Sequence, residues 1–416
     1  MIKVLRLKDI GIFKGGLTYS PENICDKEEG ILVLRSSNIQ NSKISLIDNV
    51  YVNCEVSSDL LIKKGDLLIC SRNGSANLVG KAAQIEDDIH ATWGAFMMIF
   101  RTSYNSRYTY YLLNDSITKN KGLFSTSTIN QLTNSMLGNI YVNFELDISE
   151  QEKIARYLDT KVGEIDQKVS LIEKKIERYQ LLKKSIINKI VTKGLHPEAP
   201  LKDSQISWLG QIPEHWEVKR IKDIISLVFM GTSPSYEYEV ENENYVFGQR
   251  NNQLYKIDFN GLKHATNEFF NSRSEYEYLT YGDVIINTLG GGSVGRVGYF
   301  DYLGDMRMIT DGHVMILRSN SYSTKFLYYY LHSKRRELEN LASGSTNQSF
   351  FNISDIVVLY LPAPPLSEQQ EIASYLDQKC ADIDAIIANC IAQIEKYKTL
   401  KRALINEVVT GKRAIE

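Results

Sequence analysis

The sequence lacks the features that would place it in a membrane, in an oxidising compartment or among metalloproteins. Its 416 residues contain no apolar run near the roughly 20 residues that a membrane-spanning helix needs. The first residues alternate like a strand and contain no signal-peptide core. The five cysteines form no CxxC pair and no metal-ligand spacing with the six histidines. We therefore expect a cytoplasmic protein with no disulfide framework, no metal site and no membrane association.

The motifs of nucleotide-using enzymes are missing too. No GxxxxGKS or GxxxxGKT phosphate loop is present, and no glycine-rich S-adenosylmethionine loop accompanies a DPPY-like or NPPY-like tetrapeptide. Residues 290–297, GGGSVGRV, satisfy the pattern GxGxxG, but the strand-like residues 297–300 follow where a dinucleotide-binding loop requires a helix. We therefore predict a glycine-rich hairpin at this point and no catalytic residue in the chain.

A net positive charge, the usual mark of a nucleic-acid-binding domain, is also missing. The 48 lysines and arginines are outweighed by 50 acidic residues, for a formal charge of −2. A nucleic-acid-binding protein of this composition needs a local basic cleft or basic partners. The same balance leaves open a different class of protein, a non-catalytic coiled-coil scaffold or interaction protein.

What the sequence does contain is a repeat. Residues 149–192 reappear without a gap as residues 367–410, with about 20 of the 44 aligned positions identical. Fainter repeats precede each copy, such as VLRLKDI at residues 4–10 and VKRIKDI at residues 218–224. The period is too long for a solenoid, so one domain-plus-helix module has been duplicated in tandem. Because the globular parts have diverged and the helices have not, we expect two different ligands on one frame.

Each copy of the repeated segment has the pattern of a long helix. Ser149 precedes Glu152 by three residues and Ser367 precedes Gln370 by three, which is the spacing of a capping box. Apolar residues then recur at spacings of three and four, the seam of a coiled coil. The predicted helix-pairing residues are Ile165, Val169, Ile172, Ile176, Tyr179, Ile383, Ile387, Ile394, Tyr397 and Leu404, and the same seam runs through Leu182 and Leu400. Two matched seams in one chain favour antiparallel pairing, with one globular module at each end.

Three longer motifs resemble a known family. They are SWLGQIPEHW at residues 207–216, LPAPPLSEQQ at residues 361–370, and the two matching helices. Together they resemble the specificity (S) subunit of type I restriction–modification systems over essentially the whole chain. The entry to the first helix departs from the pattern, because YVNFELDI at residues 141–148 lacks the prolines of the second entry. Since proline stiffens a chain, this departure questions the rigidity of the first joint between domain and helix.

The resemblance implies an α+β fold with two pseudo-symmetric target recognition domains of mixed β/α structure, joined by two long helices that form an antiparallel coiled coil. The predicted boundaries are residues 1–148 for the first recognition domain, 149–194 for the first spacer helix, 195–366 for the linker and second recognition domain, and 367–416 for the second spacer helix.

The resemblance also implies a function without catalysis by this chain. In the family, each recognition domain reads one half of a bipartite double-stranded DNA target through the major groove. The paired helices set the gap and dock methyltransferase subunits, two of them in the expected complex, which nuclease and translocase subunits join. Adenine-N6 methylation and ATP-dependent cleavage then belong to partners, as do S-adenosylmethionine, ATP and magnesium. A narrower alternative is a silent specificity subunit, or one that is exchanged by recombination.

Candidate DNA-contacting residues come from loops rich in side chains that suit base edges and phosphates. Such loops recur at equivalent places in both modules, although glycine, asparagine and serine also form ordinary turns. The candidates are Arg35, Ser37, Asn38, Arg72, Asn73, Ser75, Asn130, Gln131, Gln249, Arg250, Asn251, Asn252, Thr288, Arg296, Ser345, Thr346, Asn347 and Gln348. Among them, the four arginines are the strongest predictions, because a guanidinium can contact guanine or a phosphate through two hydrogen bonds.

Overall fold

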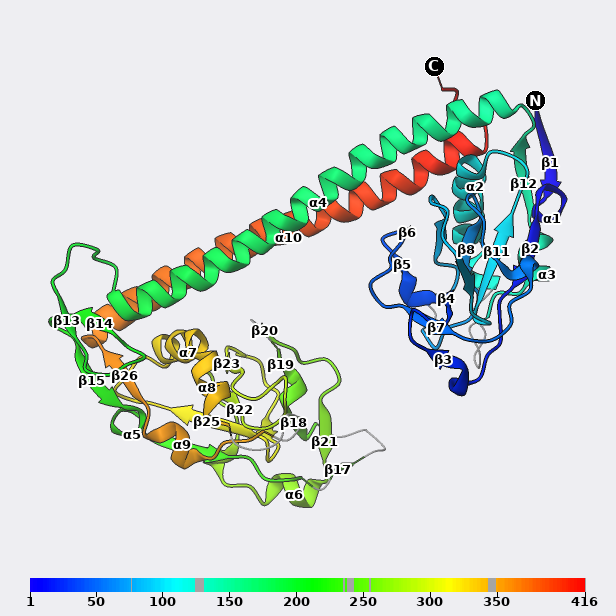
Figure 1. Ribbon diagram of the computed structural model, residues 1–416. Coiled ribbons are helices and arrows are strands. Elements are labelled where there is room, and N and C mark those ends of the chain that lie inside the picture. Colours follow the sequence, from blue (N-terminus) through cyan, green and yellow to red (C-terminus); the bar gives the residue numbers. More distant parts are fainter. Residues whose placement is uncertain are drawn as a thin grey trace. The chain divides into compact units, whose positions relative to one another are not determined.

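The computed structural model describes residues 1–75, 77–123, 131–234, 236–237, 243–253, 256–342 and 349–415. The chain divides into two compact units, each containing one globular domain and parts of two long helices (Figure 1). Unit 1 comprises Met1–Glu173 and Cys390–Glu416, and unit 2 comprises Lys174–Asn389. The helices are α4 (Ile148–Lys193) and α10 (Leu366–Val409), so the boundary between the units crosses both of them.

The globular domain of unit 1 combines short strands with a few helices. Its strands are β1 (Ile2–Arg6), β2 (Ile12–Gly15), β3 (Ile24–Cys25), β4 (Ile31–Leu34), β5 (Ile39–Gln40), β6 (Lys43–Ile44), β7 (Val50–Val52), β8 (Leu67–Cys70), β9 (Ala82–Gln84), β10 (Ala91–Trp93), β11 (Met97–Arg101) and β12 (Tyr141–Glu145). Its helices are α1 (Leu7–Ile10), α2 (Ser106–Lys119) and α3 (Asn134–Gly138). One of its 3₁₀ turns, η2, spans Ser36–Asn38.

The globular domain of unit 2 is built in the same way. Its strands are β13 (Leu201–Asp203), β14 (Gln211–Pro213), β15 (Glu217–Arg220), β16 (Leu227–Met230), β17 (Tyr236–Glu237), β18 (Tyr245–Phe247), β19 (Asn252–Gln253), β20 (Lys256–Ile257), β21 (Lys263–Ala265), β22 (Val284–Asn287), β23 (Val297–Tyr299), β24 (Met308–Thr310), β25 (Val314–Arg318) and β26 (Tyr360–Ala363). Its helices are α5 (Ile221–Ile224), α6 (Asn267–Asn271), α7 (Thr324–Ser333), α8 (Arg335–Leu341) and α9 (Ile353–Val357), with the 3₁₀ turn η5 at Gln249–Asn251.

The two domains have the same sheet topology. One four-stranded sheet has the order β2-β11-β8-β9 in unit 1 and β16-β25-β22-β23 in unit 2. The other has the order β10-β4-β7-β3 in unit 1 and β24-β18-β21-β17 in unit 2, and each contains one parallel pair, β4 with β10 and β18 with β24. The faint repeat in the sequence is therefore a complete duplication of an α+β domain, with two pseudo-symmetric copies in one chain.

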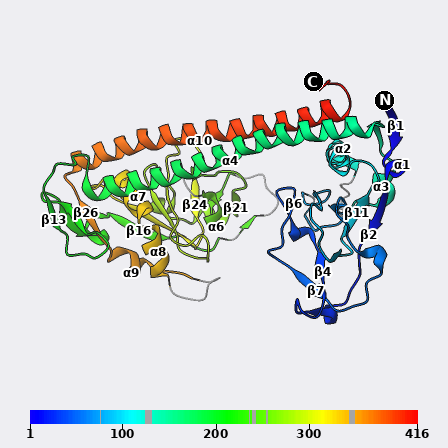
Figure 2. The same cartoon turned by 45° about the horizontal axis from the view of Figure 1, so that its top comes forward.

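In each unit the hydrophobic core joins the domain to the long helices. In unit 1, buried residues of α2 and of the β8–β11 sheet pack with Leu158 and Val162 of α4 and with Leu404 and Val408 of α10. In unit 2, α7 and the β22–β25 sheet pack against the C-terminal part of α4 and the N-terminal part of α10. Because opposite ends of the two helices meet the same core, α4 and α10 run antiparallel within each unit, where they lie side by side (Figures 1 and 2).

The ten predicted helix-pairing residues are all buried or half-buried. The predicted seam was wrong at Leu182 and Leu400, which are 46% and 52% exposed. The next residue in each helix turns inward and forms an ion pair with the other helix: Lys183 with Asp384 at 2.7 Å, and Lys401 with Asp166 at 2.7 Å. A straight helix drifts by about 20° per heptad from a strict seven-residue seam, and this drift carries both leucines to the solvent face.

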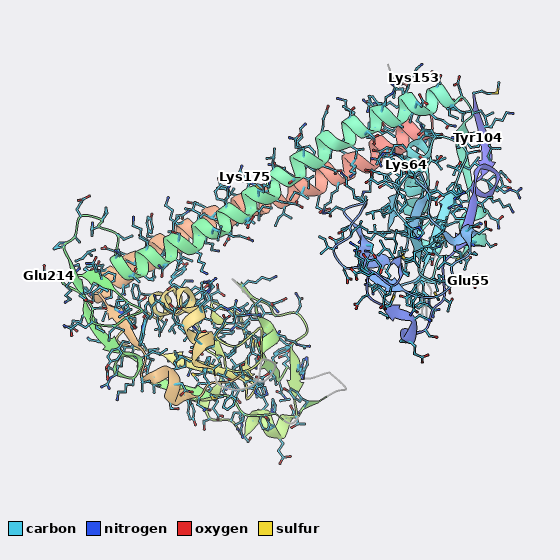
Figure 3. The ribbon with its side chains drawn as sticks, viewed as in Figure 1. Glu55, Lys64, Tyr104, Lys153, Lys175 and Glu214 are labelled. Carbon is cyan, nitrogen blue, oxygen red and sulfur yellow. The ribbon has the colours of Figure 1, made fainter. Side chains whose placement is uncertain are left out.

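The first long helix carries solvent-exposed lysines. Lys153 and Lys175 are labelled in Figure 3, and the side chains of both are exposed. Gly194 directly follows α4, Gly411 lies two residues after the end of α10, and both adopt φ of +73°, the left-handed conformation in which helices commonly end.

A buried glutamine fixes each domain to its helix. Gln151 of α4 donates to the carbonyl of Glu145 at 2.6 Å and accepts from the main chain of Asn105 at 3.0 Å. Gln369 of α10 makes the equivalent bonds to the carbonyl of Pro364 and the main chain of Ser323, both at 2.8 Å. The first joint thus has the same buried clamp as the second, without its prolines.

Both long helices begin two residues earlier than the capping boxes predicted, because caps at Ser149 and Ser367 would start them at residues 150 and 368, whereas α4 starts at Ile148 and α10 at Leu366. Asp147, not Ser149, provides the cap, since its carboxylate accepts the main-chain N–H of Ser149 at 2.8 Å. That hydrogen bond holds the pKa of Asp147 below its usual value. Beside this joint, the ring of Tyr104 (labelled in Figure 3) packs edge-on against Phe144 with centroids 4.8 Å apart.

The second tryptophan of the SWLGQIPEHW motif, Trp216, packs at the joint between the second domain and its helix. Trp216 is fully buried in the core that contains Val191 of α4 and Leu376 of α10. Its indole N–H donates to Glu368 in the first turn of α10 at 3.1 Å, and His215 contacts the same carboxylate at 2.9 Å. The motif therefore holds the linker against the point where one long helix ends and the other begins.

The glycine-rich segment is a hairpin, as predicted. β22 and β23 pair antiparallel on either side of it, with Val284 opposite Tyr299. Gly290 and Gly295 have φ values of +98° and +72°, a region that glycine adopts without steric cost.

Among the described residues, all five cysteines are unpaired, and none of the helices is long and apolar enough to cross a membrane.

His332 of α7 should make the stability of unit 2 depend on pH. Burial, reinforced by the nearby charges of Lys183 and Arg335, lowers the pKa of His332 to about 4. The unfolded chain takes up this proton near pH 6.5, so the stability contribution is present above pH 6.5 and is lost as the pH falls to 4. When the pH falls from 7.5 to 4.5, we expect the His332→Asn variant to lose roughly 2–3 kcal/mol less of its free energy of unfolding than the wild type. The substitution introduces the residue found at the equivalent position of unit 1, Asn114.

Urea unfolding of wild type and variant at both pH values provides the measurement. Carboxylates also titrate in this range, but they do so equally in the two proteins, so the difference between them isolates His332. Identical losses of stability in both proteins would contradict a buried neutral imidazole.

Candidate nucleic-acid interface

In unit 1, a cleft of about 1100 Å³ opens among loops at the ends of the strands. Five loops form it: the segment after β2, the η2 turn after β4, the loop between β6 and β7, the segment after β8, and the turn between β10 and β11. The side chains that line it include Thr18, Tyr19, Arg35, Ser36, Ser37, Asp48, Arg72, Asn73 and Phe96. Cations, amides and hydroxyls therefore surround an exposed aromatic ring.

Unit 2 carries a smaller cleft of about 190 Å³ at the corresponding place. Its lining includes Tyr236, Gln249, Arg250, Lys263, Asp311 and His313. Each cleft thus has two cationic side chains and one carboxylate among its lining residues, although the whole chain carries a charge of −2. This local positive balance suits a polyanion such as DNA.

The main chain holds the two clefts in the same way. The carbonyl of Phe96 accepts the N–H of Ser71 at 2.9 Å, and the carbonyl of His313 accepts the N–H of Thr288 at 3.0 Å. An isolated bridge pairs Arg72 with Gln131 in unit 1, and its counterpart pairs Leu289 with Phe350 in unit 2. The scaffold is conserved between the domains while the side chains on it differ.

Two of the predicted DNA-contacting residues, Asn38 and Asn251, lie inside the loops and hold them together. Both are buried, at 0% and 1% exposure. The side chain of Asn38 accepts from the N–H of Arg35 at 2.9 Å and donates to the carbonyl of Ser45 at 2.9 Å. Asn251 does the same with Gly248 at 3.1 Å and Asp258 at 2.8 Å. The amides of both residues are thus engaged inside the loop, where they hold the neighbouring residues in position.

Three further candidates of the second domain are also engaged in contacts within the domain, and their contact with DNA stays a prediction. Asn252 and Thr288 are 0% and 2% exposed, and Asn252 donates to Asn287 at 2.9 Å. Arg296 turns inward, where its guanidinium donates to the carbonyl of Asn252 at 3.0 Å and of Gly292 at 3.3 Å. Burial lowers the pKa of Arg296, and the positive charge of Arg335 adds to this effect. Arg296 fastens the glycine hairpin to the neighbouring loop.

Arg72 and Arg250 are the exposed arginines at the two clefts. The guanidinium of Arg72 lies over the ring of Phe96, 5.5 Å from its centroid. Arg250 is exposed at the η5 turn. Arg35 already forms an ion pair, because one of its terminal nitrogens is 3.1 Å from the carboxylate of Asp48. Its buried Nε has no hydrogen-bond partner in the described part of the chain. Arg72 and Arg250 are therefore better placed than Arg35 for contact with a ligand.

Smaller polar candidates surround the arginines. Asn73 donates to Ser36 at 3.3 Å and accepts from the main chain of Ser75 at 3.0 Å, which forms a compact turn beside Arg72. Ser75 and Gln131 are exposed, and Ser37 is half-buried. Gln249 is half-buried, and its side-chain oxygen accepts from Ser293 at 2.9 Å. The remaining candidates, Asn130, Ser345, Thr346, Asn347 and Gln348, lie outside the described residues.

Other residues at the clefts were not among the sequence candidates. Tyr19 and Phe96 line the first cleft, and Lys263 and His313 line the second. Asp311 is there as well; burial raises the pKa of its carboxyl group, although an N–H donated by His313 opposes the shift. The sequence candidates lie in loops rich in serine, asparagine and arginine. Aromatic and isolated charged residues in strand-like segments therefore gave no signal.

Across the residues that the structure describes, no three histidine, cysteine, aspartate or glutamate side chains gather closely enough to hold a metal ion. The clefts consist of surface loops at the ends of strands, lined by hydrogen-bonding side chains and cations. Such an arrangement can position a phosphate backbone and read base edges.

Comparison with known proteins shows the family to which the chain belongs. The sequence profile described as type I restriction modification DNA specificity domain matches residues 2–178 and 213–396. The type I restriction enzyme StySPI specificity subunit of Salmonella potsdam is 24% identical over 413 residues, which cover 95% of this chain and 86% of that protein. The chain belongs to the family of type I restriction–modification specificity subunits.

Solved structures share the fold. A chain from a study of complex assembly and conformational transition of the type I restriction–modification system has a TM-score of 0.72 and 17% identity, covering 99% of this chain and 98% of that one. The HsdS subunit of Thermoanaerobacter tengcongensis has a TM-score of 0.50 and 18% identity, covering 99% and 97%. The likeness extends over both domains and both helices.

Proposed function

We propose that this chain selects the DNA sequence on which a type I restriction–modification complex acts, with each domain reading one half of a bipartite target. One observation carries the proposal: the two domains place different side chains on the same cleft scaffold. Arg72, Phe96 and Ser37 in unit 1 correspond to Leu289, His313 and Arg250 in unit 2. Two clefts with the same backbone arrangement but different side chains suit two half-sites of different sequence.

The long helices support a second part of the proposal. We expect α4 and α10 to set the gap between the half-sites and to dock two methyltransferase subunits, which nuclease and translocase subunits join. Each helix is continuous over more than 40 residues, which suits a fixed spacer. The chain itself is then non-catalytic and acts in the cytoplasm, while partner subunits use S-adenosylmethionine, ATP and magnesium.

The alternative of a coiled-coil scaffold or interaction protein is not favoured by the family match over both domains. Local positive charge at each cleft also removes its main support, which was the overall charge of −2. A silent or exchangeable specificity subunit has the same biochemical function and differs only in whether it is expressed or exchanged by recombination.

Replacing Arg250 by alanine tests the assignment of the second cleft. We expect Arg250→Ala to weaken binding to the specific target by about 1–3 kcal/mol and to relax base preference in one half-site only, because a guanidinium that contacts a guanine carries both effects. Equilibrium binding of the assembled complex to target duplexes with single base-pair changes measures this.

The matched control is Arg336→Ala, which removes an exposed arginine of the same unit that lies outside the cleft. Salt titration separates two roles: a lost phosphate contact reduces the salt slope by about one and weakens all sequences equally. Unchanged affinity and unchanged site preference in Arg250→Ala would remove Arg250 from the interface.

A further inference from the structure

Phe96 is a large apolar residue that is exposed to solvent in the first domain. Its ring is 61% exposed at the tip of the turn between β10 and β11, although the flanking residues Trp93 and Met97 are buried. At 61% exposure, Phe96 gains only a small part of the free energy that full burial of a phenylalanine would provide. The position therefore calls for an explanation outside the stability of the domain.

The turn holds Phe96 rigidly in place. Its carbonyl accepts two main-chain N–H groups, from Ser71 at 2.9 Å and from Arg72 at 3.1 Å, and the N–H of Met97 donates to Gly94 at 2.8 Å. These hydrogen bonds fix the backbone of the turn on both sides of Phe96. The ring is presented at the cleft in a prearranged position.

The second domain shows that the fold does not require an aromatic hydrocarbon here. The equivalent residue is His313, whose carbonyl accepts from Thr288 as that of Phe96 accepts from Ser71. His313 is also exposed and lines its cleft. Two side chains of different polarity on one backbone position indicate that the position serves recognition, with a different partner group in each half.

We propose that Phe96 is a specificity-determining residue that contacts the C5 methyl group of a thymine in the first half-site. A phenyl ring forms no conventional hydrogen bond with a base edge, and in the major groove the thymine methyl is the apolar group that distinguishes one base pair from the others. Arg72 stacks on the same ring at 5.5 Å, so its guanidinium is held beside the methyl contact, where it can reach a neighbouring guanine or phosphate.

This inference rests on the proposed function, and its test uses deoxyuridine, which is thymidine without the methyl group. The assembled complex containing the full chain is titrated with target duplexes in which each thymine of both half-sites is replaced in turn. We expect the wild type to lose roughly three- to tenfold in affinity at one thymine of the first half-site. Phe96→Ala is expected to bind the thymine and deoxyuridine duplexes equally at that position.

Phe96→His is the matched variant, because the second domain already carries histidine on this turn; it should fold normally and also lose the methyl preference. Thymines of the second half-site should respond alike in wild type and Phe96→Ala. A first half-site without thymine, no methyl-sensitive position, or a methyl preference that survives Phe96→Ala would overturn the assignment. Failure of the wild type to bind any DNA sequence selectively would instead contradict the proposed function itself.

Discussion

Lengthening both long helices by seven residues is expected to widen the gap of the DNA target while leaving the bases of both half-sites unchanged. The insertion duplicates residues 168–174 in α4 and the equivalent residues 386–392 in α10, which lie close to the boundary between the two units. Seven residues are about two helical turns, so the apolar seam stays in register. They add about 10.5 Å of helix, which corresponds to at most about three base pairs at roughly 3.4 Å per step.

An insertion in α4 alone is the control for this experiment. It shifts one seam against the other and displaces the ion pairs that Asp166 and Asp384 make with the opposite helix, so we expect loss of specific DNA binding. Mapping of the methylated sites, or selection of bound duplexes from a random pool, measures half-sites and gap together. Altered half-site bases with an unchanged gap would contradict the role of the helices as a spacer.

Replacing Arg318 by methionine is expected to destabilise unit 2 by about 3–5 kcal/mol, because it leaves a buried carboxylate without its counterion. Asp283 is 1% exposed, and the guanidinium of Arg318 donates to both of its oxygens, at 2.5 and 2.8 Å. The same guanidinium also donates to the carbonyls of Tyr276 and Tyr278. Methionine keeps much of the aliphatic volume, so the loss reports the charge and its hydrogen bonds.

Unit 1 contains a matched pair. Arg101 donates to both oxygens of the buried Asp66, at 2.7 and 2.6 Å, and we expect Arg101→Met to destabilise unit 1 by a similar amount. Hydrogen exchange resolved by segment shows which unit has lost protection. Combining Arg318→Met with Asp283→Asn should recover part of the stability, since no buried charge then remains. A loss below about 0.5 kcal/mol in Arg318→Met would contradict this account.

The sequence was sufficient to predict the helices, their antiparallel pairing and the duplicated domain. Helical periodicity is a local signal that repeats over many turns, and two copies of it restrict the topology further. It could not predict the direction in which Lys183 and Leu182 point, because one residue of drift along a helix exchanges a seam position for a solvent position.

The cleft residues were harder to predict from sequence, because turn chemistry and base recognition use the same residue types. Asn38 and Asn251 carry amides that could read a base, yet both amides complete the hydrogen bonding of a 3₁₀ turn. The sequence likewise gave no means to see that Phe96 is exposed, since it lies in an otherwise buried strand-like segment. Exposure and hydrogen-bond partners, which depend on long-range packing, separate residues that support a loop from those that face a ligand.

The most direct test of the proposed function is genome-wide mapping of N6-methyladenine in the host, with and without this gene. Deletion of the gene is expected to abolish methylation at a single bipartite motif, two short sequences around a fixed gap, and the intact gene supplied on a plasmid is expected to restore it. An unchanged methylome in a host that expresses the chain together with its methyltransferase partners would contradict the central claim that this chain selects the DNA target.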